Sequence, residues 1–506
     1  MIRVSLIAVA ALAMLGADKP GTVDYRLSVA PQTNGSPAVN VEIRLRGDAD
    51  GETRIVLPQS AVSGLAVSGA TTSAPDTGHT VLRHRPGARL TVRYRLRSEG
   101  PGPGQLAMPG AAVLAVPEGR PGQPVTLRWA RVPKGWRALS DLDSGATARA
   151  PKITDLATAV VMAGSNLQIT ERMMPGGTLQ VAAFGNAGDA ARLAELAAPL
   201  IGAQRAFWLD APGAFLVAAG FKVAAENGQN LMLPADILSR SDPSDLMAQT
   251  LTRSWIPQRL GAPAASATGI MDGLAGFYAD RIRLRAGLLP HNAAVSTLAM
   301  ADTRGHAGSR GAILVLKWDE DIRRKSAGKL NLDDVVLRMR DHYQRFSPGQ
   351  GPDVITGLVS AAWVTAGIDL RPDIARYAAG GAVIPLPETM FDGCLDARVT
   401  VSPDFDAGFD AAGSFTAKAV RGVRRGGPAW NSGLRNGMIL DSWTYTAGDM
   451  NREIELTVRA AAKRAKPRKA RFWPYGDVDV ETRKLQLAVG LSDAQTAVCA
   501  RKIGGL

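Results

Sequence analysis

The hydrophobic pattern of this chain changes its period along the sequence, and this change limits the folds open to it. Residues 23–29, 41–46 and 90–96 alternate apolar and polar side chains. A period of two is typical of strands that bury one face, and Gly, Pro, Asn and Asp separate the runs as turns would. We therefore predict an N-terminal β-sandwich domain over residues 18–150.

The middle of the chain has the spacing of helices. Segments 189–201, 272–289 and 332–340 each place their large apolar residues on one helical face, and Asn331 is a suitable N-cap for the last. The segments predict a mainly helical domain over residues 151–395. A chain of 506 residues is too long for one compact core, so we expect a multidomain α+β protein.

A smaller pattern follows near the C-terminus. Residues 417–423 read as a strand, and a short helix, a turn closed by glycine and a second strand come after it. The stretch from Gly426 to Met438 resembles the G-x-P-A-x-x-A-G-L-x-x-G-D run of PDZ domains, with Met438 at the place of the Asp. We predict a PDZ-like domain over residues 396–480 and a tail over residues 481–506.

The first residues have the features of an export signal. A positive start at 1–3 precedes an apolar run at 4–15, and small residues suited to cleavage stand at 11–13 and 15–17. We predict a signal peptide over residues 1–17 and a secreted or periplasmic protein. A retained membrane anchor is the alternative, and no later apolar stretch predicts a membrane span.

The chain has two cysteines, Cys394 and Cys499. In an exported protein two cysteines can form one disulfide, which here would tie the last residues to the start of the C-terminal region. Two free thiols are the alternative.

The formal net charge is +13, and many of the basic residues lie within 459–471. A basic run of this kind can bind nucleic acid or an anionic surface. Export argues against nucleic acid as a partner. We predict a solvated basic turn between two strands, with weak attraction to anionic lipid or cell-envelope polymer as the alternative.

Residues 245–260 have the frame of a zinc-metallopeptidase helix. Such helices carry H-E-x-x-H, in which two histidines at i and i+4 bind zinc and the glutamate acts as general base. The matching positions here hold Gln249, Thr250 and Arg253. Asp272 follows nineteen residues after Arg253, at the place of a third, acidic ligand.

These substitutions remove the chemistry that zinc catalysis needs. Arg253 has no free lone pair and stays protonated, Gln249 offers only a weak amide oxygen, and Thr250 has no carboxylate. No two histidines have the i, i+4 spacing and none lies in the motif, the five being His79, His84, His291, His306 and His342. The sequence therefore predicts no zinc cofactor.

Several runs together resemble the glycyl aminopeptidase family of metallopeptidases. They are Ser254–Leu260, Gly273–Tyr278, Gly311–Arg323 and Asn331–Asp334, and the resemblance covers roughly residues 20–480. It implies an exported β-domain, a thermolysin-like domain, a PDZ domain and zinc aminopeptidase activity. The departures of this chain fall at the zinc ligands and the general base.

The resemblance also implies roles for residues outside the zinc helix. Gly308 stands where a tyrosine of the family often precedes an x-R-G turn. Glu226 matches an acidic residue that binds the substrate amino terminus in related exopeptidases, with a plain loop residue as the alternative. Gly408 and Phe409 match a loop that captures a peptide C-terminus, and a purely structural PDZ fold is the alternative.

The sequence thus predicts a catalytically inactive homologue of a zinc aminopeptidase, which binds a peptide or protein through the old cleft, the PDZ-like domain or both. An active metallo-aminopeptidase with an atypical site is the alternative. A serine hydrolase is disfavoured because no G-x-S-x-G motif is present. In the vacated site we expect Arg253 to pair with Asp272, and Gln249 to add a hydrogen bond. The alternative places Arg253 in solvent.

Overall fold

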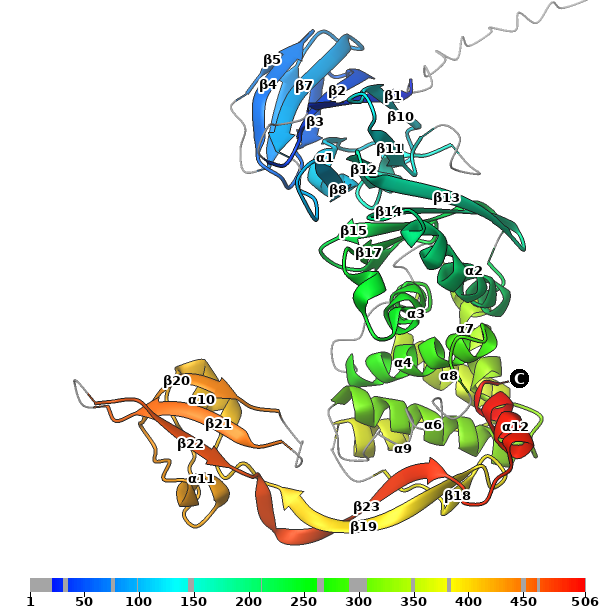
Figure 1. Ribbon diagram of the computed structural model, residues 1–506, viewed down its shortest axis with the longest axis vertical. Helices are drawn as coiled ribbons and strands as arrows, with labels where there is room; N and C mark the ends of the chain where they lie inside the picture. Colours follow the sequence, from blue (N-terminus) through cyan, green and yellow to red (C-terminus); the bar gives the residue numbers. More distant parts are fainter. Residues whose placement is uncertain are drawn as a thin grey trace, which may run out of the picture. The chain divides into compact units, whose positions relative to one another are not determined.

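The chain forms two units, each with strands and helices (Figure 1). The computed structural model describes residues 21–30, 35–73, 78–97, 99–143, 150–210, 212–261, 268–290, 307–346, 351–379, 384–446, 452–461 and 465–505. Unit 1 comprises the residues up to 194 and 212–240, and unit 2 comprises 195–211 and the residues from 241. The predicted signal peptide over residues 1–17 lies outside the described residues.

Unit 1 begins with two sheets, in the strand orders β10-β1-β2-β7-β4 and β5-β6-β3-β9. Their strands are β1 (Val23–Ala30), β2 (Ala38–Arg46), β3 (Glu52–Val56), β4 (Val62–Ser68), β5 (Thr71–Thr72), β6 (His79–Arg83), β7 (Arg89–Arg97), β9 (Val116–Pro117) and β10 (Val125–Arg131). Strands β1, β2 and β7 bury the apolar member of each alternating pair, as their period of two predicts.

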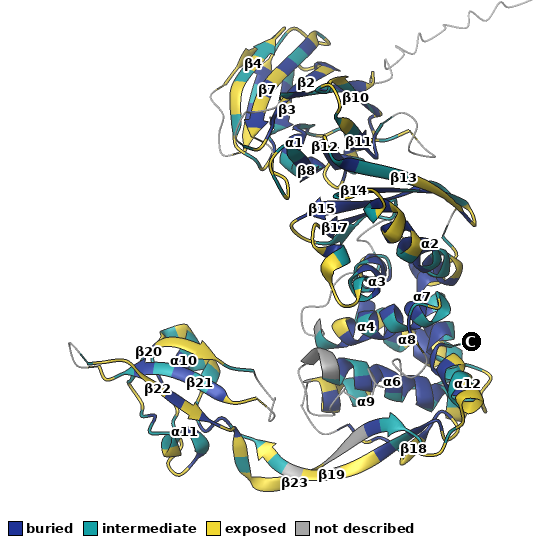
Figure 2. Cartoon of the chain, in the orientation of Figure 1, coloured by how far each residue is buried: buried dark blue, intermediate teal, exposed yellow. Residues whose placement is uncertain are grey.

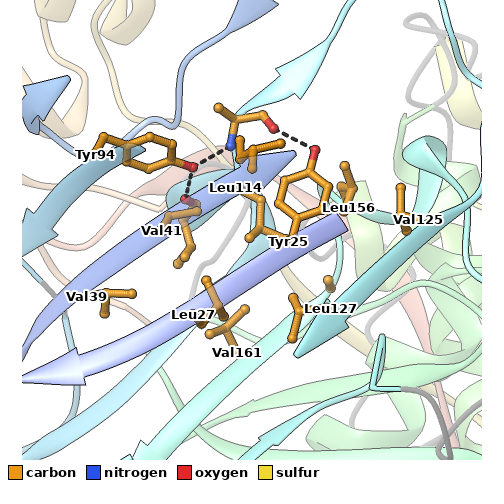
Figure 3. Packing of buried hydrophobic residues seen from close by; sticks show 14 of the residues in the cluster. Tyr25, Leu27, Val39, Val41, Tyr94, Leu114, Val125, Leu127, Leu156 and Val161 are labelled. Carbon is orange, nitrogen blue, oxygen red and sulfur yellow. Dashed lines mark hydrogen bonds between the residues drawn. The ribbon is translucent and has the colours of Figure 1, made fainter. Parts of the chain in front are cut away.

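Two tyrosines tie this core to the short helix α1 (Gly110–Val113) and the residues after it. Tyr25 donates a hydrogen bond to the Ala115 carbonyl at 2.8 Å, and Tyr94 donates to the Val113 carbonyl at 2.8 Å (Figure 3). Both rings are almost completely buried. Their hydroxyls therefore need these partners, because a buried polar group without a hydrogen bond destabilises the fold.

Unit 1 continues with two further sheets, in the orders β11-β12-β8 and β13-β14-β15-β17-β16. Their strands are β8 (Gln105–Pro109), β11 (Arg137–Ser140), β12 (Val160–Gly164), β13 (Leu167–Met174), β14 (Gly177–Phe184), β15 (Phe215–Phe221), β16 (Ala225–Glu226) and β17 (Asn230–Pro234). We predicted a mainly helical domain from residue 151, whereas much of the chain up to residue 234 forms strands. Strand β15 is apolar and buried at every position, so its sequence has no alternation to identify it.

Helix α2 (Asp189–Trp208) begins in unit 1 and ends in unit 2. Unit 2 then contains α3 (Pro243–Arg253), α4 (Thr268–Arg285), α6 (Ala307–Lys325), α7 (Leu332–Tyr343), α8 (Val354–Ala366), α9 (Arg371–Asp373) and the π-helical turn η4 (Ile374–Ala379). The predicted N-cap of α7 is confirmed: the Asn331 side chain accepts from the Asp333 N–H, and Asp334 accepts from the Asn331 N–H. None of the helices described is long and apolar enough to cross a membrane.

The last helix, α12 (Asp493–Ile503), is fixed to the rest of unit 2 by a disulfide and by arginines. Cys499 bonds Cys394, with an S–S distance of 2.07 Å. Arg281 donates to the Ile503 carbonyl at 2.8 Å and Arg323 to the Lys502 carbonyl at 2.9 Å. Residues 481–505, predicted as part of a tail, are thus the end of a strand and this anchored helix.

Strands β18 (Thr389–Met390), β19 (Leu395–Phe405) and β23 (Tyr475–Leu487) form one sheet, and much of β19 and β23 is exposed (Figure 2). Between β19 and β23 the chain forms a small module with its own core, which we call the C-terminal module. It comprises α10 (Ala411–Ala417), α11 (Pro428–Asn431), β20 (Ile439–Thr444), β21 (Ile454–Arg459) and β22 (Arg468–Phe472).

The C-terminal module follows the predicted pattern from α11 onward and differs before it. Residues 417–423 form no strand, and only Ala419 makes a single β-bridge, to Ile439. Gly422 adopts a φ of +62°, which a regular strand does not contain. The basic run begins at the last residue of β21 and continues into β22, so only residues 460–467 connect the two strands, and residues 462–464 of it are outside the described part.

Candidate functional site

Helix α3 carries the positions that match a zinc motif. Asp242 caps its N-terminus by accepting from the Asp245 N–H, and Pro243 occupies the first turn, where no N–H is needed. Met247, Ala248 and Leu251 bury one face of the helix. The less buried face presents Gln249, Thr250 and Arg253, with Gln249 and Arg253 one turn apart.

Arg253 reaches Asp272 of α4. The Arg253 Nη2 atom lies 3.7 Å from the Asp272 Oδ1 atom, and the two side chains are 58% and 49% exposed. The two positions are therefore neighbours in space, as the zinc-site frame predicts. The ion pair is long and solvated, so it contributes no more than about 1 kcal/mol to stability.

Gln249 and Thr250 bond to their own helix. Gln249 donates from Nε2 to Asp245 Oδ2 at 3.0 Å, and Thr250 donates to the Leu246 carbonyl at 2.7 Å. We expected the Gln249 hydrogen bond to join the Arg253–Asp272 pair. The structure directs it one turn toward the N-terminus of α3 instead, because Asp245 lies at the i−4 position with a free acceptor.

A buried arginine lies at the centre of a carboxylate cluster beside these residues. Arg283 of α4, only 5% exposed, contacts Asp280 at 2.9 Å, Asp245 at 3.3 Å and also Asp242. Its Nε atom donates to Ser244 at 3.2 Å. This cluster, Asp242, Asp245, Asp280 and Arg283, joins the start of α3 to the end of α4.

Burial raises the pKa of the Asp280 carboxyl to about 6. Arg283 acts in the opposite direction by stabilising the ionised form, and the nearby Asp245 and Asp242 charges raise the pKa again. Protonation of Asp280 near pH 6 therefore changes the charge of the cluster by one unit.

The geometry offers little to a zinc ion. Among the described ranges, no group of three or more His, Cys, Asp and Glu side chains is arranged to hold a metal. At the aligned positions, the Arg253 guanidinium would repel a cation, and Asp272 is the one carboxylate. In the neighbouring cluster, Arg283 already supplies the positive charge among the three aspartates.

The segment after α3 forms an aromatic anchor within unit 2. Trp255 stacks on Trp208 with ring centroids 4.6 Å apart, and the Arg259 guanidinium lies 4.5 Å above the Trp255 ring. Arg259 also pairs with Asp210 at 3.4 Å. The run Ser254–Leu260, which carries much of the family resemblance, therefore holds the end of α3 against α2.

Two other predicted positions lie elsewhere in the chain. Gly308 is in the first turn of α6. Glu226 is in β16 of unit 1, where its Oε1 atom accepts from the Gly228 N–H at 2.5 Å. Asn227 holds the same hairpin by donating to Thr158 Oγ1 at 2.9 Å. These hydrogen bonds hold the turn and, with it, the Glu226 carboxylate in a defined position.

The predicted carboxylate-binding loop lies in the C-terminal module. Gly408 has a φ of +69°, and its N–H donates to Asp406 Oδ1 at 2.7 Å. Arg424 pairs with the same Asp406 carboxylate. Phe409 packs against the module core, with its ring 6.2 Å from Phe415. One backbone donor of this loop is therefore already satisfied by a carboxylate of the chain itself.

A pocket of about 1020 Å³ lies in unit 1, and none of the predicted site residues lines it. Its wall includes Met108, Phe221 and Met232, and also Lys222 and Glu99, which pair at 2.7 Å. This pocket and the Arg283 cluster were both missed by the sequence analysis. The spacing of Asp280 and Arg283 at i, i+3 was the available signal for the cluster.

Comparison of the sequence with models of protein families and with curated proteins finds no match. Comparison with solved structures finds an aminopeptidase N family protein from Idiomarina loihiensis, with 14% identity and a TM-score of 0.65. The match covers 95% of this chain and 100% of that one. The likeness shows that the chain has the metallopeptidase-like fold of this aminopeptidase N family protein.

Other solved structures are similar over less of the chain. An M1 zinc metallopeptidase from Deinococcus radiodurans matches with 15% identity and a TM-score of 0.46, over 73% of this chain and 95% of that one. The LTA4 hydrolase of yeast, in complex with bestatin, matches with 10% identity and a TM-score of 0.41. That match covers 73% of this chain and 69% of the hydrolase.

Proposed function

We propose that this chain is an exported, non-catalytic relative of the zinc aminopeptidases and that it acts by binding a peptide or protein segment. The observation that carries the proposal is the pair of Arg253 and Asp272, which stand at two positions matched to zinc ligands. The Arg253 guanidinium lies 3.7 Å from the Asp272 carboxylate. A permanent cation at a ligand position opposes zinc binding. Thr250, at the place of the general base, has no carboxylate to accept a proton from water.

The proposed binding surface is the old substrate cleft of the peptidase fold. In unit 1, Glu226 is a candidate considered by itself, because a carboxylate that is held in place suits the positive amino terminus of a peptide. The C-terminal module, which we propose to be PDZ-like, is the second candidate. There a peptide carboxylate would have to displace Asp406 from the Gly408 N–H, which favours the cleft.

Zinc stoichiometry of the mature protein tests the loss of catalysis. The protein is purified without chelator and without a histidine tag, equilibrated with zinc and measured by elemental analysis. We expect a value near zero for the wild type. A matched variant carries Gln249→His, Thr250→Glu, Arg253→His and Asp272→Glu, and it should bind about one zinc per chain if the frame is that of a zinc site.

The outcomes separate the two functional hypotheses. One zinc per wild-type chain, together with release of amino acids from peptides, would establish the alternative of an active enzyme with an atypical site. An empty wild type beside a zinc-loaded restored variant would support the loss of function. An empty restored variant that remains folded would refute the alignment of these four positions with a zinc site.

Peptide binding is tested with a tripeptide library in two forms, with free and with acetylated amino termini. We expect the free form to bind and Glu226→Gln to weaken it, because the amino terminus then loses its counter-charge. Glu171→Gln, which removes one acidic charge from strand β13 of the same unit, is the control. Equal binding of free and acetylated peptides would contradict the role of Glu226.

A further inference from the structure

The sheet β10-β1-β2-β7-β4 has an outer face rich in arginine. The inward residues of its strands fill the core, so the alternate positions point away from it. Cross-strand neighbours on this outer face include two pairs of like charge, Arg26 opposite Arg128 and Arg46 opposite Arg89. Asp24 lies 2.9 Å from Arg26 and 3.6 Å from Arg128 and offsets the repulsion in the first pair, so the face combines a high density of arginine with a few carboxylates.

Part of the face is hollowed into a depression of about 430 Å³. We call it the arginine depression, and its polar wall includes Arg26, Asn40, Glu42, Arg44, Arg93 and Arg95. Four guanidinium groups, the Glu42 carboxylate and the Asp24 carboxylate that pairs with Arg26 leave two positive charges. Gly64 contributes to the wall without a side chain, at an irregularity in the pairing of β4 with β7.

Acidic residues hold most of these guanidinium groups in place. Glu42 accepts from Arg44 Nε at 2.7 Å through one oxygen and from Arg93 Nε at 2.7 Å through the other. Asp24 accepts from Arg26 Nε at 2.9 Å. Each of these contacts uses the Nε side of the arginine, and in the Arg26 and Arg93 contacts it leaves terminal N–H groups available.

Arg95 completes the depression in a different way. Its backbone carbonyl accepts from Ser63, but within the described ranges its guanidinium has no hydrogen bond or ion pair. Asn40 is its direct cross-strand neighbour on β2 and adds an amide that can donate to an anion. The depression therefore combines fixed guanidinium groups with one that is free to bind.

We propose that the arginine depression is a binding site for an anion that carries phosphate groups. A guanidinium presents two parallel N–H donors that match two oxygens of a phosphate, and several such groups in one concave site bind adjacent phosphates. None of the large apolar side chains that are exposed on the described surface lies on β1, β2, β7 or β10. The face therefore lacks apolar groups that would insert into a membrane, which favours a soluble oligophosphate over a lipid headgroup.

The test is calorimetric titration of the full chain with sodium tripolyphosphate at low ionic strength. We expect the wild type to bind and Arg95→Gln to weaken the affinity about tenfold, because a charge-assisted contact is lost. Arg83→Gln is the matched control, since Arg83 is a largely exposed arginine of β6 in the other sheet. It should change the affinity less than about twofold. An equal loss in both variants would overturn the site in favour of general charge attraction.

The variant Glu42→Gln distinguishes a site that depends on the positions of its guanidinium groups from general attraction by positive charge. The substitution removes one negative charge and releases Arg44 and Arg93 from their common carboxylate. A site that depends on placed guanidinium groups loses affinity, whereas attraction by charge alone gains it. Tighter binding of tripolyphosphate by Glu42→Gln would therefore refute the proposal.

Vesicles of phosphatidylcholine with phosphatidylglycerol identify the source of the phosphate. One outcome is that the wild type sediments with these vesicles, that Arg95→Gln does not, and that tripolyphosphate does not bind. This outcome would support the site and assign it to a lipid headgroup. Binding of tripolyphosphate alone supports a soluble ligand. Absence of binding to both probes would overturn the proposal.

Discussion

Asp141 is a buried carboxyl group, and its burial destabilises the ionised form. It accepts from the Val160 N–H at 2.7 Å and from Asn230 Nδ2 at 2.5 Å. Burial nevertheless raises its pKa to about 6, while these hydrogen bonds act in the opposite direction. The folded state therefore binds a proton between about pH 4 and pH 6 that the unfolded state has already released.

The sign of the pH dependence follows from this raised pKa. Stability from Asp141 is fully present below the unfolded pKa and is lost as the pH rises through about 6. We predict that the unfolding free energy of the wild type, relative to Asp141→Asn, falls by on the order of 1 kcal/mol between pH 5 and pH 7.5. Urea unfolding of both proteins at the two pH values measures it. A constant difference would show that Asp141 does not titrate there.

Two arginines on neighbouring helices should differ sharply in their contribution to stability. Arg253 makes one long, exposed contact, whereas the buried Arg283 contacts three aspartates. We predict that Arg253→Met changes the unfolding free energy by less than about 1 kcal/mol. Arg283→Met should cost more, about 1–3 kcal/mol, because it leaves the largely buried Asp280 carboxylate without its cation, while Asp242 and Asp245 are 48% and 42% exposed. Denaturant unfolding compares them, and similar costs would refute the assigned environments.

At the scale of elements, α4 and α6 approach closely because glycines face each other. A Cβ on Gly273 would lie within 3.0 Å of the backbone of Gly311 and Ala312, and a Cβ on Gly311 would overlap the Gly269 carbonyl. Such a contact has to be relieved by moving backbone. The two helices can therefore pack at this distance only with glycine at both positions.

Gly276 of the same helix is a matched control, because a Cβ there meets no atom within 4 Å. We predict that Gly273→Ala destabilises unit 2 by about 1–3 kcal/mol or more through overpacking. Gly276→Ala should stabilise it by up to about 1 kcal/mol, since alanine favours the helix. Thermal unfolding distinguishes the two, and stabilisation by Gly273→Ala would disprove the close approach.

Elements were predictable where local chemistry decides them. The alternation in β1 and β2 and the N-cap at Asn331 depend on residues a few positions apart. Strand β15 was not predicted, because an apolar run without alternation fits a buried helix as well as a buried strand. The Arg283 cluster joins segments about forty residues apart, and its contacts depend on how α3 packs against α4.

At the scale of the whole molecule, each unit has a core of its own. Leu27 is completely buried in the apolar core of unit 1, and Leu274 and Val336 are completely buried in unit 2, where the disulfide of Cys394 with Cys499 also lies. Domains with separate cores can unfold as separate cooperative steps. The chain crosses between the units within α2, so neither unit is a single continuous segment.

We predict two calorimetric transitions that respond to different changes. Leu27→Ala leaves a cavity in unit 1 and should lower the unfolding free energy of that unit by about 2–5 kcal/mol. Each kcal/mol lost should lower the midpoint temperature of its transition by about 2–4 °C. The double substitution of Cys394 and Cys499 by alanine should lower the other. The disulfide spans 105 residues, and opening such a loop costs up to about 4–5 kcal/mol in chain entropy. If each change moved both transitions equally, the two units would unfold as one.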